Sequence, residues 1–243
     1  MEKTFLTAEW RQLVMLNYAV ERKLLAPLVP RGVELDAFDG VCYVSVVGFL
    51  FLDTRIFGIA FPFHRDFEEV NLRFYVRQRA PEGWRRGVVF VKELVPRRAI
   101  AFLARTIYGE PYSAVPMSHE ITERDGQTTL RFAWQRAGRT EFVAATTAGE
   151  PAFVTPGSLE EFITEHYWGY NTHRGRSTQY QVEHPSWRIW RATEPRFEAD
   201  VRTLYGAGFV EALATAPASS FVAEGSEVIV RRGTVLTPHQ LSS

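Results

Sequence analysis

The sequence predicts a mainly β protein of the α+β class, in which antiparallel strands are accompanied by three or four small helices. Residues 67–79 alternate between apolar and polar side chains, which is typical of a strand with one apolar face. Further apolar runs follow at short intervals, separated by turn residues such as Asp125-Gly126, as in a meander of antiparallel strands. Because no linker composition divides the chain, we expect a single domain over residues 1–243, with its core at about 10–232.

Strands dominate the pattern of the first half. In chain order we expect a strand at 10–20, a short helix at 21–28, an extended segment at 34–36, and strands at 41–51, 67–79 and 87–94. Asp39-Gly40 is a hairpin signal before the strand at 41–51, which is apolar on both faces and is therefore central. Pro96 suits the first turn of a helix whose apolar face recurs up to Ile107 and which stops at Gly109.

The second half is again mostly strand. We expect strands at 113–123, 128–136 and 140–146, a helix at 158–167, a strand at 178–183, a short helix at 198–204 and a final strand pair or bent strand at 220–231. Ser158 and Glu161 have the spacing of a capping box, which predicts the beginning of the helix at 158–167.

The charge balance excludes several classes of partner. Lys+Arg and Asp+Glu number 28 each, so the chain has no net field that would attract nucleic acid or an anionic membrane. The most apolar window, 41–52, is too short to span a bilayer, and the N-terminus lacks the apolar segment of a signal peptide. We therefore expect a cytoplasmic protein. Cys42 is the single cysteine, which excludes an internal disulfide; self-association into a homo-oligomer is left open.

Most common catalytic motifs are absent from the sequence. The six histidines form no His-x-x-x-His or Cys/His pair, so no metal site is expected. The sequence has no Gly-x-Ser-x-Gly elbow, no Walker loop and no Gly-x-Gly-x-x-Gly after a strand. Neither a nucleophilic triad nor a cofactor is therefore predicted, and a small molecule remains the expected ligand.

Carboxylates, phenols and arginines remain as candidate groups, concentrated around residues 86–117. The candidate catalytic residues are Glu93, Glu110 and Tyr112, and the candidate ligand-binding residues are Arg73, Arg105, Tyr108, His166 and Tyr170. Glu93 directly follows Lys92, so the two side chains face opposite sides of a strand. An interior Glu93 would have a raised pKa that suits a general acid or base, whereas an interior Lys92 could form a Schiff base with a ketone. In the alternative, both lie on a sheet surface.

The polar face of the 67–79 strand has two interpretations. It is either solvated or turned to the interior of a barrel, where Arg73 would be a charge kept for a function. In the second case we expect Arg73 to meet Tyr108, Glu110 and Tyr112 in one partly enclosed pocket; a purely structural pair of Arg73 with Glu110 is the alternative. Three residues after the capped helix are expected to cover one end of the barrel, as a lid or by simple packing: His166, Trp168 and Tyr170.

Several longer motifs occur across residues 10–232. They are Phe38-Asp39-Gly40, Asn71 to Arg77, Gly87-Val88-Val89-Phe90 leading to Glu93, Ala104-Arg105 leading to Tyr108-Gly109-Glu110-Pro111-Tyr112, Phe162 to Tyr170, and Val182-Glu183-His184-Pro185. Together they resemble the uncharacterised YqjF-like family of bacterial proteins.

The resemblance implies a fold similar to that of acetoacetate decarboxylase, with an antiparallel β-barrel or double sheet and helices outside. Enzymes of that superfamily form a Schiff base through a lysine just after a Gly-x-Pro corner. The matching corner here is Gly109-Glu110-Pro111, and Tyr112 stands at the lysine position. We therefore expect no Schiff-base chemistry at this corner. The partner glutamate of the superfamily falls near Glu69, and its arginine has no match.

Two functions from different classes follow. The first is an enzyme that acts on a small oxo acid by aldol, dehydration or enol chemistry. Tyr112 would donate a hydrogen bond to an oxyanion, and Glu93 or Glu110 would move a proton. The second is a non-catalytic ligand-binding or stress-associated domain that holds an apolar or acidic ligand. The missing lysine favours binding, and the retained polar corner favours an enzyme.

Overall fold

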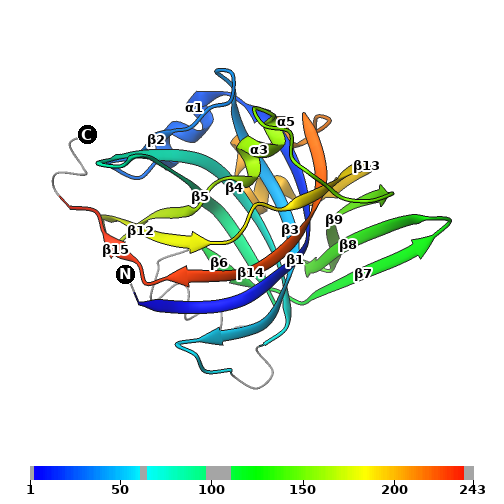
Figure 1. Cartoon of the computed structure of the whole chain (residues 1–243). Coiled ribbons are helices and arrows are strands. Elements are labelled where there is room, and N and C mark those ends of the chain that lie inside the picture. The colour runs from blue at the N-terminus through cyan, green and yellow to red at the C-terminus, as the bar shows by residue number, and fades with distance from the viewer. Residues whose placement is uncertain (1–2, 61–64, 97–110, 238–243) are drawn as a thin grey trace.

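A computed structural model describes residues 3–60, 65–96 and 111–237 of the chain (Figure 1). Most of these residues lie in strands, so the predicted mainly β class is confirmed. The strands are β1 (Thr4–Val20), β2 (Glu34–Leu35), β3 (Cys42–Ile56), β4 (Phe67–Ala80), β5 (Gly83–Val95), β6 (Tyr112–Ala114), β7 (Met117–Arg124), β8 (Gln127–Arg136), β9 (Arg139–Ala148), β10 (Ala152–Phe153), β11 (Trp168–His173), β12 (Arg176–Glu183), β13 (Arg188–Glu198), β14 (Ser219–Arg231) and β15 (Thr234–Val235). The helical segments are α1 (Arg22–Leu25), η1 (Ala26–Leu28), α3 (Leu159–Thr164), α4 (Val201–Tyr205), η2 (Ala207–Phe209) and α5 (Val210–Leu213).

The strands form a ring and a second layer beside it. Strands β12, β11, β5, β4, β3, β1 and β14 are neighbours in this order, and β12 pairs again with β14, which closes the ring. From β14 the sheet continues through β13 to β9, β8 and β7, which lie beside the ring in Figure 1. β5 pairs in parallel with β6 and with β11, whereas its pairing with β4 is antiparallel. The arrangement fits a double sheet better than a regular barrel.

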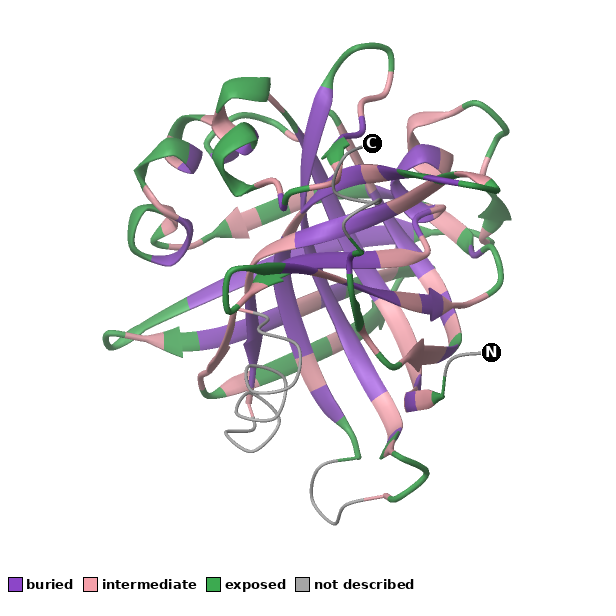
Figure 2. Cartoon of the chain, turned by 90° about the vertical axis from the view of Figure 1, so that its left-hand side faces the viewer, coloured by how far each residue is buried: buried purple, intermediate pink, exposed green. Residues whose placement is uncertain are grey.

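Two cores follow from the alternation of side chains along the ring strands. On β4, Leu72 and Phe74 point outward and pack against β8 and β9, where Phe132 belongs to the same core. Tyr75 points inward and belongs to the core inside the ring. Figure 2 shows that the buried residues gather along these central strands. Between the two open interpretations of the 67–79 strand, the structure supports the interior one, because Glu69 is only 2% exposed.

The two layers approach most closely at Gly48 on β3. A Cβ atom at this position would lie 2.7 Å from Cγ1 of Val143 and 3.0 Å from Cδ2 of Phe132. A larger residue here would force the sheets apart, so the glycine is explained by packing and not by backbone conformation.

β5 carries a bulge next to the centre of the ring. Leu72 pairs with Lys92 and Asn71 with Glu93, but Arg73 pairs with Phe90, so Val91 is an extra residue on β5. The bulge changes which residues of β5 face inward. Val88 and Phe90 line the interior on one side of it, and Glu93 does so on the other.

Several local predictions can be compared with the structure. Asp39 and Gly40 have positive φ angles of 49° and 80°, and Phe38 and Val41 pair across them, as the hairpin signal predicts. The hydroxyl of Ser158 accepts a hydrogen bond from the backbone N–H of Glu161 at the start of α3. The helix predicted from Pro96 to Ile107 lies almost wholly outside the described residues, and the single domain stays a prediction.

One long strand, β13, was missed by the sequence pattern. The alternation of β13 is interrupted after Thr193, where the register with β9 shifts before Arg196 and Glu194 has a φ angle of 48°. Pro195 stands in this irregular part. Most side chains of the strand are exposed or half-buried, so the strand has no apolar face from which it could be predicted.

Candidate functional site

A cavity of about 130 Å³ lies inside the ring. This volume suits a small organic molecule and exceeds that of one or two waters. One part of its wall is aromatic: the Trp10 ring lies edge-on to Phe49 and Phe51, with centroids 5.4 and 5.7 Å apart, and Phe51 stacks on Phe67 at 4.8 Å. β1, β3 and β4 supply these side chains. The cavity therefore has an apolar end suited to a hydrocarbon or aromatic group.

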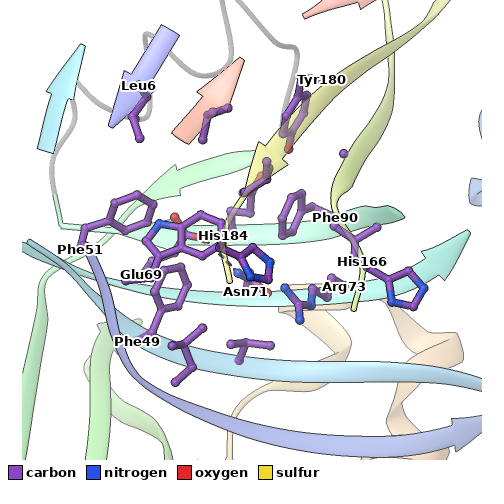
Figure 3. Close-up of a pocket in the computed structure, with 18 of the residues that line it drawn as sticks. Leu6, Phe49, Phe51, Glu69, Asn71, Arg73, Phe90, His166, Tyr180 and His184 are labelled. Carbon is purple, nitrogen blue, oxygen red and sulfur yellow. Dashed lines mark hydrogen bonds between the residues drawn. The ribbon is translucent and has the colours of Figure 1, made fainter. Parts of the chain in front are cut away.

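Polar side chains of β4 form a row that begins beside the aromatic wall, where Glu69 pairs with Phe49, and leads away from it. Glu69, Asn71 and Arg73 are two residues apart along the strand and therefore share its inward face (Figure 3). Nδ2 of Asn71 donates a hydrogen bond of 2.9 Å to Oε1 of Glu69. The hydroxyl of Tyr112 donates another, also 2.9 Å, to Oε2 of the same carboxyl group. Both oxygens of Glu69 are thus held in place.

A second carboxyl group stands beside this row. Glu93 pairs with Asn71 across β4 and β5 and with Tyr112 across β5 and β6. Its backbone N–H donates a hydrogen bond of 3.3 Å to the carbonyl of Pro111. Cross-strand neighbours lie within contact distance on one face of a sheet. The strand pairing therefore places two carboxyl groups, an amide and a phenol together.

Burial sets the protonation state of this cluster. It raises the pKa of Glu69 to about 7, although the hydrogen bonds from Asn71 and Tyr112 and the charge of Arg73 act in the opposite direction. Burial and the neighbouring carboxylates Glu69 and Glu93 raise the pKa of Tyr112 well above its usual value. Near neutral pH, Glu69 is therefore able to give or take a proton, while Tyr112 keeps its own.

Arg73 is the cationic centre of the cavity. It lies between His184 and His166 in Figure 3, and Nε of its guanidinium is buried without a hydrogen-bond partner among the described residues. Burial lowers the pKa of both histidines, that of His166 to about 4, and the charge of Arg73 contributes to both shifts. Both rings are thus uncharged at neutral pH, and Arg73 is left to attract an anion.

Each of the two histidine rings contacts a neighbouring residue. Nε2 of His166 lies 3.3 Å from Oδ2 of Asp36, the residue that follows β2. The ring of His184 stacks on Trp187, with centroids 4.2 Å apart, and its Nδ1 lies 2.9 Å from the carbonyl of Pro185. These contacts fix the orientation of both rings.

The predicted site residues fall into three groups. Arg73, Glu93, Tyr112 and His166 line the cavity. Tyr170 does not: it is fully buried in β11, where its hydroxyl donates a hydrogen bond of 3.2 Å to the carbonyl of Arg85. The remaining three lie outside the described residues: Arg105, Tyr108 and Glu110. Arg73 and Tyr112 thus share a wall, but the predicted meeting with Tyr108 and Glu110 cannot be described. Trp168 lines the cavity with His166, whereas Tyr170 packs beside it.

Other site residues were not among the predicted ones. Glu69 was noted only as the position near which the partner glutamate of the superfamily falls, and both Glu69 and Asn71 share a strand face with Arg73. His184 stands in a motif noted above. Asp36 had no signal, since it reaches His166 only through the pairing of β2 with β4. Lys92 pairs with Leu72, whose side chain belongs to the outer core, and no lysine is among the described residues that line the cavity.

The pH dependence of the free energy of unfolding should reveal the raised pKa of the buried Glu69 side chain. Because its pKa rises from 4.5 to about 7 on folding, the unfolded chain binds fewer protons in this window, and the free energy of unfolding falls as the pH rises through it. His166 acts with the opposite sign, since its pKa falls from 6.5 to about 4 on folding. His166 is present in both wild type and Glu69→Gln, so its contribution cancels when the unfolding free energies of the two proteins are subtracted.

We therefore expect the stability of Glu69→Gln, relative to wild type, to increase by about 3 kcal/mol from pH 4 to pH 8, at ~1.4 kcal/mol per pKa unit. Urea unfolding of both proteins at the two pH values measures this change. A difference that does not vary with pH would contradict a raised pKa at Glu69.

No helix in the described part of the chain has both the length and the apolar character needed to cross a membrane. Among the same residues, no group of three or more His, Cys, Asp or Glu side chains is placed to hold a metal ion.

Comparison with known proteins places the chain in a family. A family model described as an uncharacterized conserved protein, DUF2071, matches residues 7–227. The chain belongs to this family. It is 26% identical over 187 residues to the uncharacterized protein YqjF of Bacillus subtilis, covering 75% of this chain and 74% of that protein. The resemblance seen in the sequence is thus confirmed.

Solved structures show the fold. Acetoacetate decarboxylase from Legionella pneumophila superposes with a TM-score of 0.65 at 14% identity, covering 96% of this chain and 87% of that one. The enduracididine biosynthesis enzyme MppR, solved in complex with pyruvate, gives 0.67 at 15% identity, with coverages of 98% and 92%. An acetoacetate decarboxylase-like enzyme from Sphingomonas wittichii gives 0.62 at 15% identity, with coverages of 97% and 94%. The family therefore has an acetoacetate decarboxylase-like fold.

Proposed function

We propose that this protein binds a small oxo acid with an apolar body in the ring cavity and moves a proton on the carbon next to the ketone. One observation carries the proposal: the buried carboxyl group of Glu69, whose pKa is raised to about 7, is held by Asn71 and Tyr112 in a largely apolar cavity. A carboxyl group with a pKa near the working pH is suited to general acid–base catalysis.

The ligand class follows from the two ends of the cavity. Arg73 offers a guanidinium group for a carboxylate, since Nε has no hydrogen-bond partner among the described residues. The aromatic wall around Trp10 and Phe51 offers contacts for the apolar body. MppR, which shares the fold, has been solved with pyruvate and with a condensation product of pyruvate. This supports an oxo acid as the ligand.

The proposed step balances without an external reagent. The carboxylate of Glu69 takes a proton from the carbon next to the ketone, the C–H electron pair becomes a C=C bond, and the ketone oxygen becomes an enolate oxygen. Once Glu69 carries the proton, Tyr112 can redirect its hydroxyl hydrogen bond from Glu69 to that oxygen. The reverse sequence returns a proton to carbon. No Schiff base is included, because the described residues of the cavity wall include no lysine.

A non-catalytic ligand-binding role is the second candidate, favoured by the large apolar and aromatic share of the wall. It requires binding at the same cavity without proton exchange on the ligand. Measurements of binding and of exchange on one ligand therefore separate the two functions.

Binding should depend on Arg73. We expect Arg73→Met to weaken the binding of 4-phenyl-2-oxobutanoate, measured by calorimetry, by about 10- to 100-fold, as for the loss of a hydrogen bond to a charged group. Arg79→Met is the matched control, because Arg79 lies on the same strand but is exposed and stacks over Trp84. Equal affinity of Arg73→Met and wild type, or no binding to wild type, would contradict the proposal.

A further inference from the structure

His166 has a hydrogen-bonding atom that the folded chain leaves unused. The side chain is only 1% exposed, and neither ring nitrogen has a hydrogen-bond partner of regular geometry among the described residues: Nε2 lies 3.3 Å from Oδ2 of Asp36, and Nδ1 has no such contact. The residue lines the cavity, beside Arg73 (Figure 3). A buried polar atom without a partner is costly unless a ligand supplies one. The cavity is where that partner would come from.

Asp36 determines which protonation form of the ring is present. Its carboxylate accepts hydrogen bonds from Nε of Arg86 at 2.7 Å and from the backbone N–H of Ala37 at 3.1 Å. Burial alone would raise the pKa of Asp36, but His166 and Arg86 outweigh it and lower the pKa to about 2. The carboxylate is thus ionised and faces Nε2 of His166 at 3.3 Å. A neutral ring then carries its hydrogen on Nε2 and a lone pair on Nδ1.

We propose that Asp36 holds His166 as a hydrogen-bond acceptor in the cavity, so that the site recognises a hydroxyl group next to the bound carboxylate in preference to a ketone. This inference rests on the proposed function and names the form of the ligand that the site prefers. The preferred ligands are 2-hydroxy acids and the enol form of 2-oxo acids.

The preference follows from the inventory of donors and acceptors. A ketone oxygen has only lone pairs, so it cannot bond to the lone pair on Nδ1 of His166, whereas an enol or alcohol hydroxyl group donates to it. With Arg73 on the carboxylate and His166 on the neighbouring oxygen, the site matches a neutral 2-hydroxy or enol group better than the oxo acid, whereas the enolate oxygen of the proposed step is bonded by Tyr112.

Three ligands with one carbon skeleton test this inference: 4-phenylbutanoate, 4-phenyl-2-oxobutanoate and 2-hydroxy-4-phenylbutanoate. For wild type at pH 7.5 we expect calorimetry to show the 2-hydroxy acid binding about tenfold more tightly than the other two, as one buried hydrogen bond would give. Equal affinities for all three would overturn the inference and leave the proposed function standing. No binding of any of the three would overturn both.

His166→Phe should remove the discrimination and retain binding through Arg73, with the three affinities converging to within about twofold. His166→Leu is the second variant, which also lacks an acceptor, in case the phenyl ring does not pack beside Phe162 and Tyr75. His119→Phe is the control, since His119 lies on β7, outside the cavity wall, and pairs with Glu68. Retained tenfold discrimination in either His166 variant would overturn the inference.

NMR can test directly whether Asp36 determines which ring nitrogen of His166 carries the hydrogen. In ¹⁵N-labelled wild type at pH 7.5, NMR should show the His166 ring with its hydrogen on Nε2, and Asp36→Asn should shift the population toward the Nδ1-protonated form. The same variant should lose the preference for the 2-hydroxy acid. A His166 ring protonated on Nδ1 in wild type would overturn the inference directly.

Discussion

Glu69→Gln is expected to lower deuterium exchange into 4-phenyl-2-oxobutanoate, at the carbon next to the ketone, by about 10²- to 10⁴-fold at pH 7. This is the range attributed to general acid–base catalysis. The glutamine keeps an oxygen that can accept the hydrogen bond from Tyr112, but it cannot take a proton from carbon. Proton NMR in D₂O follows the loss of signal at this carbon.

Glu68→Gln is the matched control for this experiment. Glu68 precedes Glu69 on β4 and contacts His119 of β7, so it lies on the opposite face of the strand. Its exchange rate should equal that of wild type. If Glu69→Gln exchanges as fast as wild type, Glu69 is not the base. If wild type binds the oxo acid without catalysing exchange, the non-catalytic role is the correct one.

The largest effect on stability is expected for Tyr170→Ala, at about 3–5 kcal/mol, the usual cost of removing a buried aromatic side chain. Tyr170 is fully buried and packs so tightly on Gly87 that a Cβ atom at position 87 would lie 2.6 Å from its ring. Tyr170→Phe should cost only about 1 kcal/mol, for the lost hydrogen bond to Arg85. Urea unfolding measures both values.

The same variants distinguish packing from a lid. If Tyr170 only packs, folded Tyr170→Phe binds the oxo acid with wild-type affinity. A changed affinity with unchanged unfolding would instead indicate that Tyr170 covers the cavity.

Alternation along a single strand was enough to predict part of the site. Arg73 was found because β4 has a clear polar face, and the same face contained Glu69 and Asn71. Glu93 could be proposed as an inward residue but not assigned, because the bulge at Val91 interrupts the alternation of β5. The alternation of side chains predicts which residues face inward only where the strand contains no bulge.

Contacts between distant segments could not be predicted in this way. Asp36 and His166 are 130 residues apart and meet because β2 pairs with β4 while α3 ends beside the ring. The aromatic wall was also missed, since Trp10 and Phe51 look like ordinary core residues in the sequence. They line the cavity only because the strands close into a ring.

The bulge in β5 determines whether Lys92 or Glu93 faces the cavity. Val88 and Phe90 face the cavity, and regular alternation beyond them would turn Lys92 inward and Glu93 outward. Val91, the extra residue, reverses this parity and presents the carboxyl group. A β5 strand without Val91 would therefore present an amine to the cavity in place of the carboxyl group of Glu93, while Glu69 on β4 would keep its position.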